Sequence, residues 1–282
     1  MKIAFWSNSR GNSGVTSNLA CISVASAMEY SYKAILLENH NQKNNLENVL
    51  LYDRANYYLR EEENYQYKQV GINYIMKQLS NGKYETNMIK NASQMIKDGS
   101  LEILSNSLYY IPQNYVTNSE IFDYDLYGCI NHVLEVLEKF ADITYIDTSN
   151  KSNLSSKIIL EEVDLVVVNL VQNSSMIKNF FENYSSILSK CVFLISSYHK
   201  ESSLNINKIS KANLINKANI AIIPYNVDYQ EAVSQGTIVE FLSRNYNCKR
   251  KTPNYNFVNE VKKAAYMIIR NVELISQKEG SQ

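Results

Sequence analysis

The sequence predicts an α/β protein with a doubly wound, mostly parallel sheet that carries helices on both faces. The first observation is a set of short runs that are apolar at consecutive positions, which is typical of strands covered on both faces. The second is that stretches with helical spacing alternate with these runs, and this alternation implies right-handed crossover connections. The third is composition, because 45% hydrophobic and 20% charged residues are ordinary for a globular chain of 282 residues.

The elements are expected in a regular order. The strands are Ile3–Trp6, Ala34–Leu37, Ile143–Ile146, Leu165–Val171, Val192–Ile195 and Ile220–Ile223, and the helices between them include Leu19–Met28, Ile121–Phe140, Leu154–Glu162, Met176–Leu188 and Tyr229–Leu242. Residues 46–100 are expected to be mostly helical, 101–113 to form a strand with a loop, and Val258–Ile275 to form a final helix with one apolar face packed on the domain. No Pro-rich or Gly/Ser-rich linker divides the chain, so we expect a single domain over residues 1–282.

Composition and charge exclude several classes of protein. The 28 basic and 28 acidic residues balance, so no overall field attracts the chain to nucleic acid or membrane. The 4 cysteines are scattered and form no C-x-x-C pair, which indicates reduced thiols rather than a disulfide or zinc framework. No apolar run reaches the roughly 18 residues of a membrane span, and no signal-peptide pattern is present. We therefore expect a cytoplasmic protein.

The segment NSRGNSGVTSN, residues 8–18, lies between the first expected strand and the first expected helix. Glycines at the carboxyl end of a strand let backbone N–H groups converge on an anion, and the next helix adds the positive end of its dipole. Against the pattern G-x-x-x-x-G-K-[ST], Gly14 and Thr16 match, whereas Ser9 and Val15 replace the first glycine and the lysine. By pattern alone, an ordinary strand–turn–helix junction is an equal alternative.

The segment SRGNSGVTSNLA resembles the deviant Walker A loop of the ParA/MinD family of P-loop ATPases, in which two lysines flank a run of glycines. Gly11, Gly14, Thr16 and the Asn-Leu-Ala that follows match this loop. Arg10 stands at the position of the family's signature lysine, and Val15 at the position of its second lysine.

Three more segments carry the resemblance across most of the chain. AILLENHNQKNNLENVL is similar to the second strand and its loop, with Glu38 and His40 at the positions of two aspartates, the second of which assists water attack in active members. DITYIDTSNKSN looks like the Walker B strand, although the glycine that usually follows is absent, and INKANIAIIPYNVDYQEAVSQGTIVEFL resembles the late strand and Ile-Pro turn beside the adenine.

The resemblance implies a set of site residues. It places Arg10, Gly11, Asn12, Ser13, Gly14, Val15, Thr16, Ser17, Pro224 and Tyr225 against ATP, and Thr16 and Asp147 against Mg²⁺. No catalytic residue is assigned with confidence, because His40 at the catalytic aspartate position cannot act as an ionised carboxylate. In the family the signature lysine reaches across a dimer to the partner's nucleotide, so Arg10 either plays that part or is a solvated loop residue.

The departures weaken the chemistry of this site. A charge-assisted contact is worth about 1.5–3 kcal/mol, so losing the lysine at Val15 is expected to weaken nucleotide binding about tenfold to a hundredfold. Phosphoryl transfer depends on positioning and on neutralising developing charge, which the changes at Val15 and His40 both reduce. The sequence therefore favours a degenerate site with weak or lost hydrolysis.

Three functions remain open. The leading hypothesis is a dimerising positioning or recruitment factor for a pilus or secretion complex or for DNA; TadZ-like pilus-localising proteins of this family also carry altered Walker loops. The alternatives are an active Mg-ATPase switch, in which Arg10 compensates for Val15, and a protein-binding scaffold that is indifferent to nucleotide. The basic segment CKRKTP (248–253) gives DNA contact only weak support.

Overall fold

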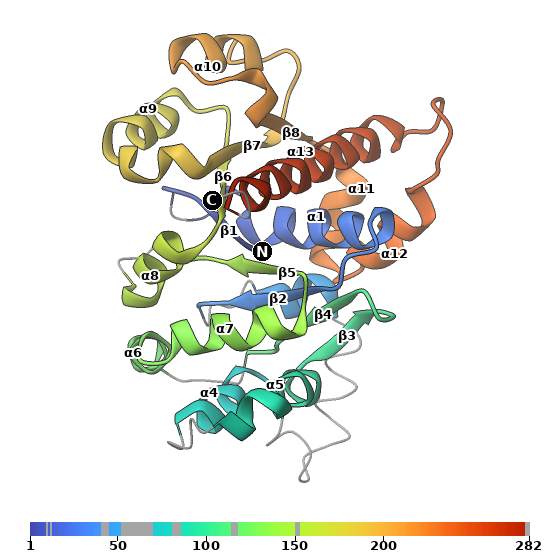
Figure 1. Cartoon of the computed structure of the whole chain (residues 1–282). Coiled ribbons are helices and arrows are strands. Elements are labelled where there is room, and N and C mark those ends of the chain that lie inside the picture. The colour runs from blue at the N-terminus through green and yellow to red at the C-terminus, as the bar shows by residue number, and fades with distance from the viewer. Residues whose placement is uncertain are drawn as a thin grey trace.

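The computed structural model describes residues 1–9, 11, 13–40, 45–51, 70–80, 86–113, 118–149 and 153–279. A mixed sheet runs through the middle of the molecule. Among these residues the strand order is β3-β4-β2-β5-β1-β6-β7-β8 (Figure 1). The strands are β1 Lys2–Trp6, β2 Ala34–Glu38, β3 Leu101–Leu104, β4 Leu108–Tyr110, β5 Ile143–Asp147, β6 Leu165–Leu170, β7 Cys191–Tyr198 and β8 Ile220–Pro224.

All neighbouring strands from β4 to β8 in this order pair in parallel, which confirms the predicted doubly wound sheet. The exception among the described strands is β3, which pairs antiparallel with β4 at one edge. The sequence predicted one strand and a loop here. The structure has a hairpin because the chain reverses at residues 105–107, where Asn106 takes a positive φ of 57°.

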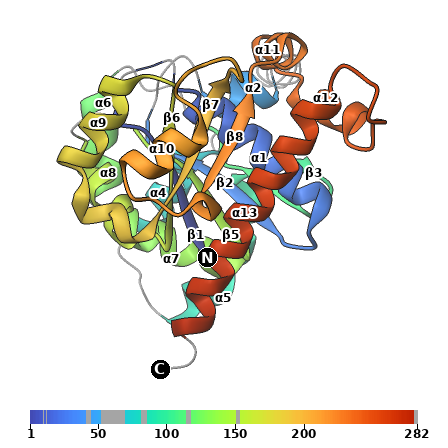
Figure 2. The ribbon, with the colours of Figure 1, turned by 90° about the horizontal axis from the view of Figure 1, so that it is seen from above.

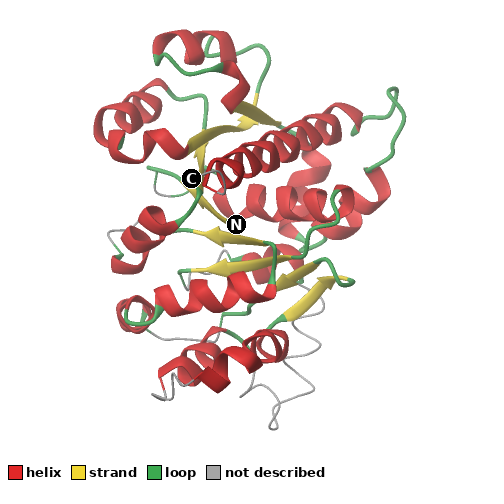
Figure 3. Cartoon of the chain, in the orientation of Figure 1, coloured by secondary structure: helices red, strands yellow, loops and turns green. Residues whose placement is uncertain are grey.

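Helices cover both faces of the sheet (Figure 3). One face carries α1 Val15–Glu29, α2 Leu46–Leu50, α11 Val227–Ser234, α12 Ile238–Asn245 and α13 Tyr255–Glu279. The other carries α4 Ile72–Ser80, α5 Thr86–Gly99, α6 Ser119–Tyr127, α7 Ile130–Phe140, α8 Leu154–Glu162, α9 Ser174–Asn183 and α10 Ile206–Ala212. Seen from above, α9 and α10 lie across the sheet from α13 (Figure 2).

The consecutive apolar residues of each central strand feed two separate cores. In β1, Ile3 and Phe5 pack into the core under α1 and α13, whereas Ala4 and Trp6 pack into the core under the opposite helices. Alternate side chains of a strand point to opposite faces, so a strand covered on both sides is mostly apolar at consecutive positions. This is why the unbroken apolar runs predicted the strands correctly.

Several predicted helices are interrupted. The stretch 121–140 forms α6 and α7 with a break at Gly128 and Cys129, and the stretch 229–242 forms α11 and α12 with a break at Gly236, whose φ is 66°. The stretch 176–188 ends α9 at Asn183 and continues as a 3₁₀ turn, Ser185–Lys190. Helical periodicity continued through each break because both flanking helices pack on the same face of the sheet, so periodicity alone could not place the interruptions.

Within the described ranges, every helix is either too short or too polar to traverse a lipid bilayer.

Candidate functional site

The loop between β1 and α1 has the backbone shape expected of an anion cradle. Gly11 and Gly14 have φ values of 78° and 73°, in the left-handed region that favours glycine. Gly14 is the N-cap residue of α1 and provides no side-chain cap, and the first helical hydrogen bond runs from Asn18 N to Gly14 O at 2.8 Å. The first N–H groups of α1 therefore point out of the helix end without a capping side chain. Arg10 and Asn12 lie outside the described residues.

Buried polar side chains hold this loop against the sheet. Asn18 Nδ2 donates to Asn169 Oδ1 at 2.9 Å and to Ser196 Oγ at 2.7 Å. Ser196 Oγ in turn donates to Ser13 O at 2.6 Å. A Cβ on Gly14 would lie 3.1 Å from Asn18 Nδ2, so the loop and helix leave little room for any other residue there. The loop is thus tied to the ends of β6 and β7.

A cavity of about 790 Å³ opens above the loop, at the carboxyl ends of the central strands. Gly14, Val15, Thr16 and Ser17 form one wall, and Asp147 with the residues after it forms another. Most of the remaining lining is hydroxyl or amide side chains, among them Ser7, Ser9, Ser13, Ser149, Ser197 and Gln230. The place of the cavity is the one at which open α/β sheets bind their ligands.

The cavity has the backbone shape of a phosphate site but lacks the positive charge of one among its described side chains. None of the described residues that line the cavity is lysine or arginine. Val15, at the position where the resemblance expects a lysine, is partly buried and packs against the hydrophobic core under α1. Among the described lining residues, the acidic or imidazole side chains are those of His40 and Asp147. The backbone therefore fits a phosphate group, whereas the described side chains supply no fixed positive charge to hold one.

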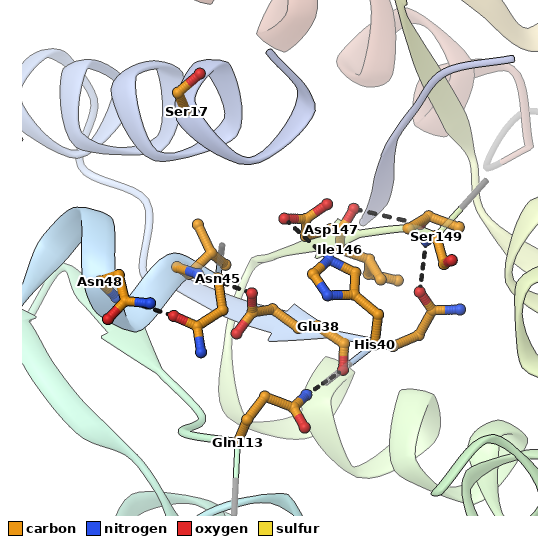
Figure 4. Close-up of polar contacts among 12 residues, drawn as sticks. Ser17, Glu38, His40, Asn45, Asn48, Gln113, Ile146, Asp147 and Ser149 are labelled. Carbon is orange, nitrogen blue, oxygen red and sulfur yellow. Dashed lines mark hydrogen bonds and ion pairs between the residues drawn. The ribbon is translucent and has the colours of Figure 1, made fainter. Parts of the chain in front are cut away.

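The side chains of Glu38, His40 and Asp147 lie close together (Figure 4), and His40 and Asp147 line the cavity. Strands β2 and β5 pair in register with Glu38 opposite Asp147, which brings the two carboxylates to the same level. His40 Nε2 lies 3.3 Å from Asp147 Oδ2. One ligand-type atom from each of the three side chains lies within 4.8 Å of the others, and all three residues are buried. Sequence reasoning assigned no role to Glu38.

The Glu38 carboxylate is held from two sides. Leu46 N donates to Oε1 and Tyr110 Oη donates to Oε2, each at 2.7 Å. Burial and, to a smaller extent, the charge of Asp147 raise the pKa of the Glu38 carboxyl to about 7, although His40 and the two hydrogen bonds act to lower it. Glu38 is therefore poised to change its protonation near neutral pH.

The end of β5 is held by a further polar network. Ser149 N donates to Asn39 Oδ1 at 2.7 Å, and Asn39 Nδ2 donates to Ser155 Oγ and Ser156 Oγ at the start of α8. These contacts connect the segment after β2 with the segment after β5, directly beyond Asp147, the last residue of β5. They fix the backbone on either side of the carboxylate cluster.

The residues expected at the adenine end separate in the structure. Pro224, at the end of β8, lines the cavity together with Gln230 and Val233 of α11. Tyr225 is not part of the described lining, is 51% exposed, and stacks on His199 with ring centroids 5.2 Å apart. Thus Gly11, Ser13, Gly14, Val15, Thr16, Ser17, Asp147 and Pro224 surround one cavity, and Tyr225 lies outside it.

Asn169 and Ser196 carry no local signal in the sequence. They lie 151 and 178 positions from Asn18, which donates a hydrogen bond to each of them. A charged residue directly after an apolar run, as in AILLE, is the signal that could have singled out Glu38 as a buried carboxylate.

The fold and the position of the loop define the class. The parallel sheet, the helices on both faces and a glycine-containing loop between β1 and α1 at its carboxyl edge are those of a ParA/MinD-like P-loop ATPase fold. No family model and no curated protein matches the sequence.

Three solved structures illustrate the similarity. A ParA family ATPase from Chlorobium tepidum TLS superposes with a TM-score of 0.66 at 12% identity, covering 94% of this chain and 98% of that one. The cell division ATPase MinD of Pyrococcus furiosus gives a TM-score of 0.66 at 16% identity, covering 95% and 98%. The septum site-determining protein MinD of Pyrococcus horikoshii OT3, complexed with Mg-ADP, gives 0.60 at 13% identity, covering 95% of each chain.

Proposed function

We propose that this chain is a single ParA/MinD-like domain with a degenerate ATP site, which binds nucleotide weakly and acts as a dimerising positioning or recruitment factor. The observation that carries the proposal is the mismatch between the shape and the charge of the cavity. The glycine cradle and the helix end are kept, while no lysine or arginine is found among the described lining residues.

In this proposal the nucleotide lies along the cavity. Its phosphates contact the backbone N–H groups at the start of α1, and its base lies towards Pro224 and Gln230. Thr16 and Asp147 are the residues that would hold Mg²⁺, which neutralises phosphate charge when it is bound. The complex of a similar protein with Mg-ADP supports this assignment of ligand class.

We propose that hydrolysis is weak or lost. His40 occupies the position at which an ionised carboxylate assists water attack in active members of the resembled family, and it faces Asp147 at 3.3 Å. Val15 directs an apolar side chain towards the core where a cation is needed at the phosphates. A protein with these two changes would act by dimerising and by binding its cargo, which is a protein complex or DNA, rather than by hydrolysing ATP.

The decisive experiment is calorimetric titration with ATP and Mg²⁺ of the natural chain, Val15→Lys and Val15→Met. The lysine variant restores a charge and is expected to bind about 10–100-fold more tightly than the natural chain. The methionine variant lengthens the side chain without a charge and is expected to bind like the natural chain. Gly14→Asp, which places a carboxylate in the cradle, is expected to abolish binding.

Two other outcomes would replace the proposal. Turnover of ATP by the natural chain that disappears in Asp147→Ala would establish an active switch. No binding by any variant, Val15→Lys included, would establish a scaffold that is indifferent to nucleotide. Sedimentation velocity with and without ATP and Mg²⁺ tests the dimer, which the proposal expects to be populated more with nucleotide than without it.

A further inference from the structure

We infer that Glu38, His40 and Asp147 form a binding site for a divalent transition-metal ion, with Zn²⁺ as the best-fitting representative. This site shares Asp147 with the proposed Mg²⁺ site, but it goes beyond the proposed function because its ligands are side chains alone and need no nucleotide. It also differs in chemistry from a Mg²⁺ site. Imidazole nitrogen suits Zn²⁺ and its neighbours in the first transition row, whereas Mg²⁺ prefers oxygen ligands and keeps several waters.

The geometry of the three ligand atoms is the first support. Two ligands of one tetrahedral Zn²⁺, each bonded at about 2.1 Å, lie roughly 3.4 Å apart. His40 Nε2 and Asp147 Oδ2 are already separated by 3.3 Å. The Glu38 carboxylate completes a group whose members all lie within 4.8 Å, so an approach of at most about 1.4 Å brings it to the separation of roughly 3.4 Å that a shared ion needs.

The second support is the state of Asp147. The residue is 1% exposed, and its Oδ2 atom accepts no hydrogen bond from any residue that the structure describes. Buried carboxylate oxygens are normally satisfied by donors or by a cation. The contact with His40 is an ion-pair distance rather than a hydrogen bond of good geometry, and a cation between the two atoms would satisfy the oxygen.

The surroundings of Glu38 are those of an oriented ligand. Tyr110 Oη and Leu46 N each donate to one of its oxygens, and each oxygen keeps a second lone pair for an ion. Hydrogen bonds of this kind fix the direction of a ligating carboxylate and sustain its affinity for metal. The two carboxylates also give the cluster a charge that a dication neutralises.

Access comes from one side. His40 and Asp147 line the cavity, while Glu38 lies behind them. An ion held by these three side chains therefore keeps a coordination position open to the cavity. Three protein ligands with one open position, which water or a ligand can occupy, are typical of catalytic zinc sites, whereas closed structural sites have four protein ligands.

The test is titration of the chelator-treated full chain with ZnCl₂ in the absence of nucleotide, so that a failure of ATP binding leaves the result unaffected. One Zn²⁺ per chain is expected. Removing a residue that merely orients a ligand costs 10–100-fold in affinity, so His40→Gln is expected to weaken binding by about 100-fold or more. His132→Gln and His199→Gln are matched controls, because these exposed histidines lie away from the cluster, and they are expected to change affinity by less than about twofold.

The inference is overturned if the natural chain binds no Zn²⁺ stoichiometrically, or if His40→Gln binds as tightly as the controls. If His40→Gln fails to fold, X-ray absorption of the zinc-loaded natural chain decides. One imidazole with an otherwise oxygen-containing shell is expected. A shell with sulfur would place the ion at a cysteine and overturn the inference.

Discussion

His40 Nε2 lies 3.3 Å from Asp147 Oδ2. His40 follows the end of β2, and Asp147 is the last residue of the neighbouring strand β5. Both side chains are buried at the floor of the cavity, with Glu38 beside them. The cluster therefore contains two carboxylates and an imidazole. The family pattern that the sequence resembles would put three carboxylates there, so the substitution removes negative charge from a place that solvent hardly reaches.

Restoring that third carboxylate is expected to destabilise the protein. In His40→Asp, three acidic groups share the cluster, and like charges about 4 Å apart repel with about 4 kcal/mol at the effective dielectric of a protein. We expect the free energy of unfolding in urea to fall by about 2–4 kcal/mol at neutral pH after chelation, and to recover when millimolar Mg²⁺ is added. Fluorescence of Trp6, the one tryptophan of the chain, reports the transition.

The control is His199→Asp, on an exposed histidine, which is expected to change stability by less than about 0.5 kcal/mol. Equal stability of His40→Asp and the natural chain without added metal would contradict the close packing of the three groups.

Glu38 is expected to make stability depend on pH. Its carboxyl has a pKa of about 7 in the folded protein against an ordinary value of 4.5. The folded state thus holds the proton more tightly, so this contribution to stability is complete below pH 4.5 and is lost as the pH rises to about 7. In Glu38→Gln the loss, up to about 3 kcal/mol, is expected to disappear.

Urea unfolding of chelator-treated protein at intervals between pH 4.5 and 8 measures this effect. The difference in unfolding free energy between Glu38→Gln and the natural chain should grow with pH over this window. A difference that stays constant with pH would show that Glu38 is ionised in the folded protein throughout.

Gly14 and Gly128 offer a matched pair of substitutions. Gly14 has a φ of 73° and a Cβ there would approach Asn18 Nδ2 to 3.1 Å, so Gly14→Ala is expected to destabilise by about 1–2 kcal/mol. Gly128 has a φ of −64° and the nearest atom to a Cβ is 3.5 Å away. Gly128→Ala is therefore expected to be stabilising by about 0.4–1 kcal/mol. Thermal unfolding followed by circular dichroism compares the two, and the same sign for both would refute the assigned loop geometry.

The polar network under the loop is expected to be costly to cut. Asn18→Ala leaves Asn169 Oδ1 and Ser196 Oγ without their buried donor, and each buried group left unsatisfied costs about 1–3 kcal/mol. Asn131→Ala, at an exposed position of α7, is the control and is expected to be nearly neutral. Hydrogen exchange adds a local readout, because amides of the β1–α1 loop should lose protection in Asn18→Ala at a temperature where both proteins remain folded.

The sequence predicted the strands well because β1, β2, β5, β6, β7 and β8 are largely buried on both faces and are therefore mostly apolar. The loop after β1, Asp147 and Pro224 were expected to lie together and do line one cavity, since parallel strands end at the same edge. The break between α11 and α12 at Gly236 was not predicted, because the apolar residues keep helical spacing on both sides of it.

The partners within the site could not be predicted. Asn18 reaches Ser196, 178 positions away, and Tyr110 reaches Glu38, 72 positions away. Such pairs are created by the register of neighbouring strands and by the depth of a side chain in the sheet, neither of which appears in a local pattern. The position of Tyr225 shows the same limit, because it follows Pro224 directly and yet turns out to stack on His199.

The edges of the sheet bear on how two copies can meet. At one edge β3 has only four residues and an irregular register against β4, and at the other β8 has five residues and ends at Pro224, which offers no backbone N–H. Short, irregular or proline-terminated borders are poor templates for recruiting a neighbouring strand. Self-association by continuing the sheet from one molecule into the next is thus disfavoured, and a dimer of this chain is expected to form through helices and loops instead.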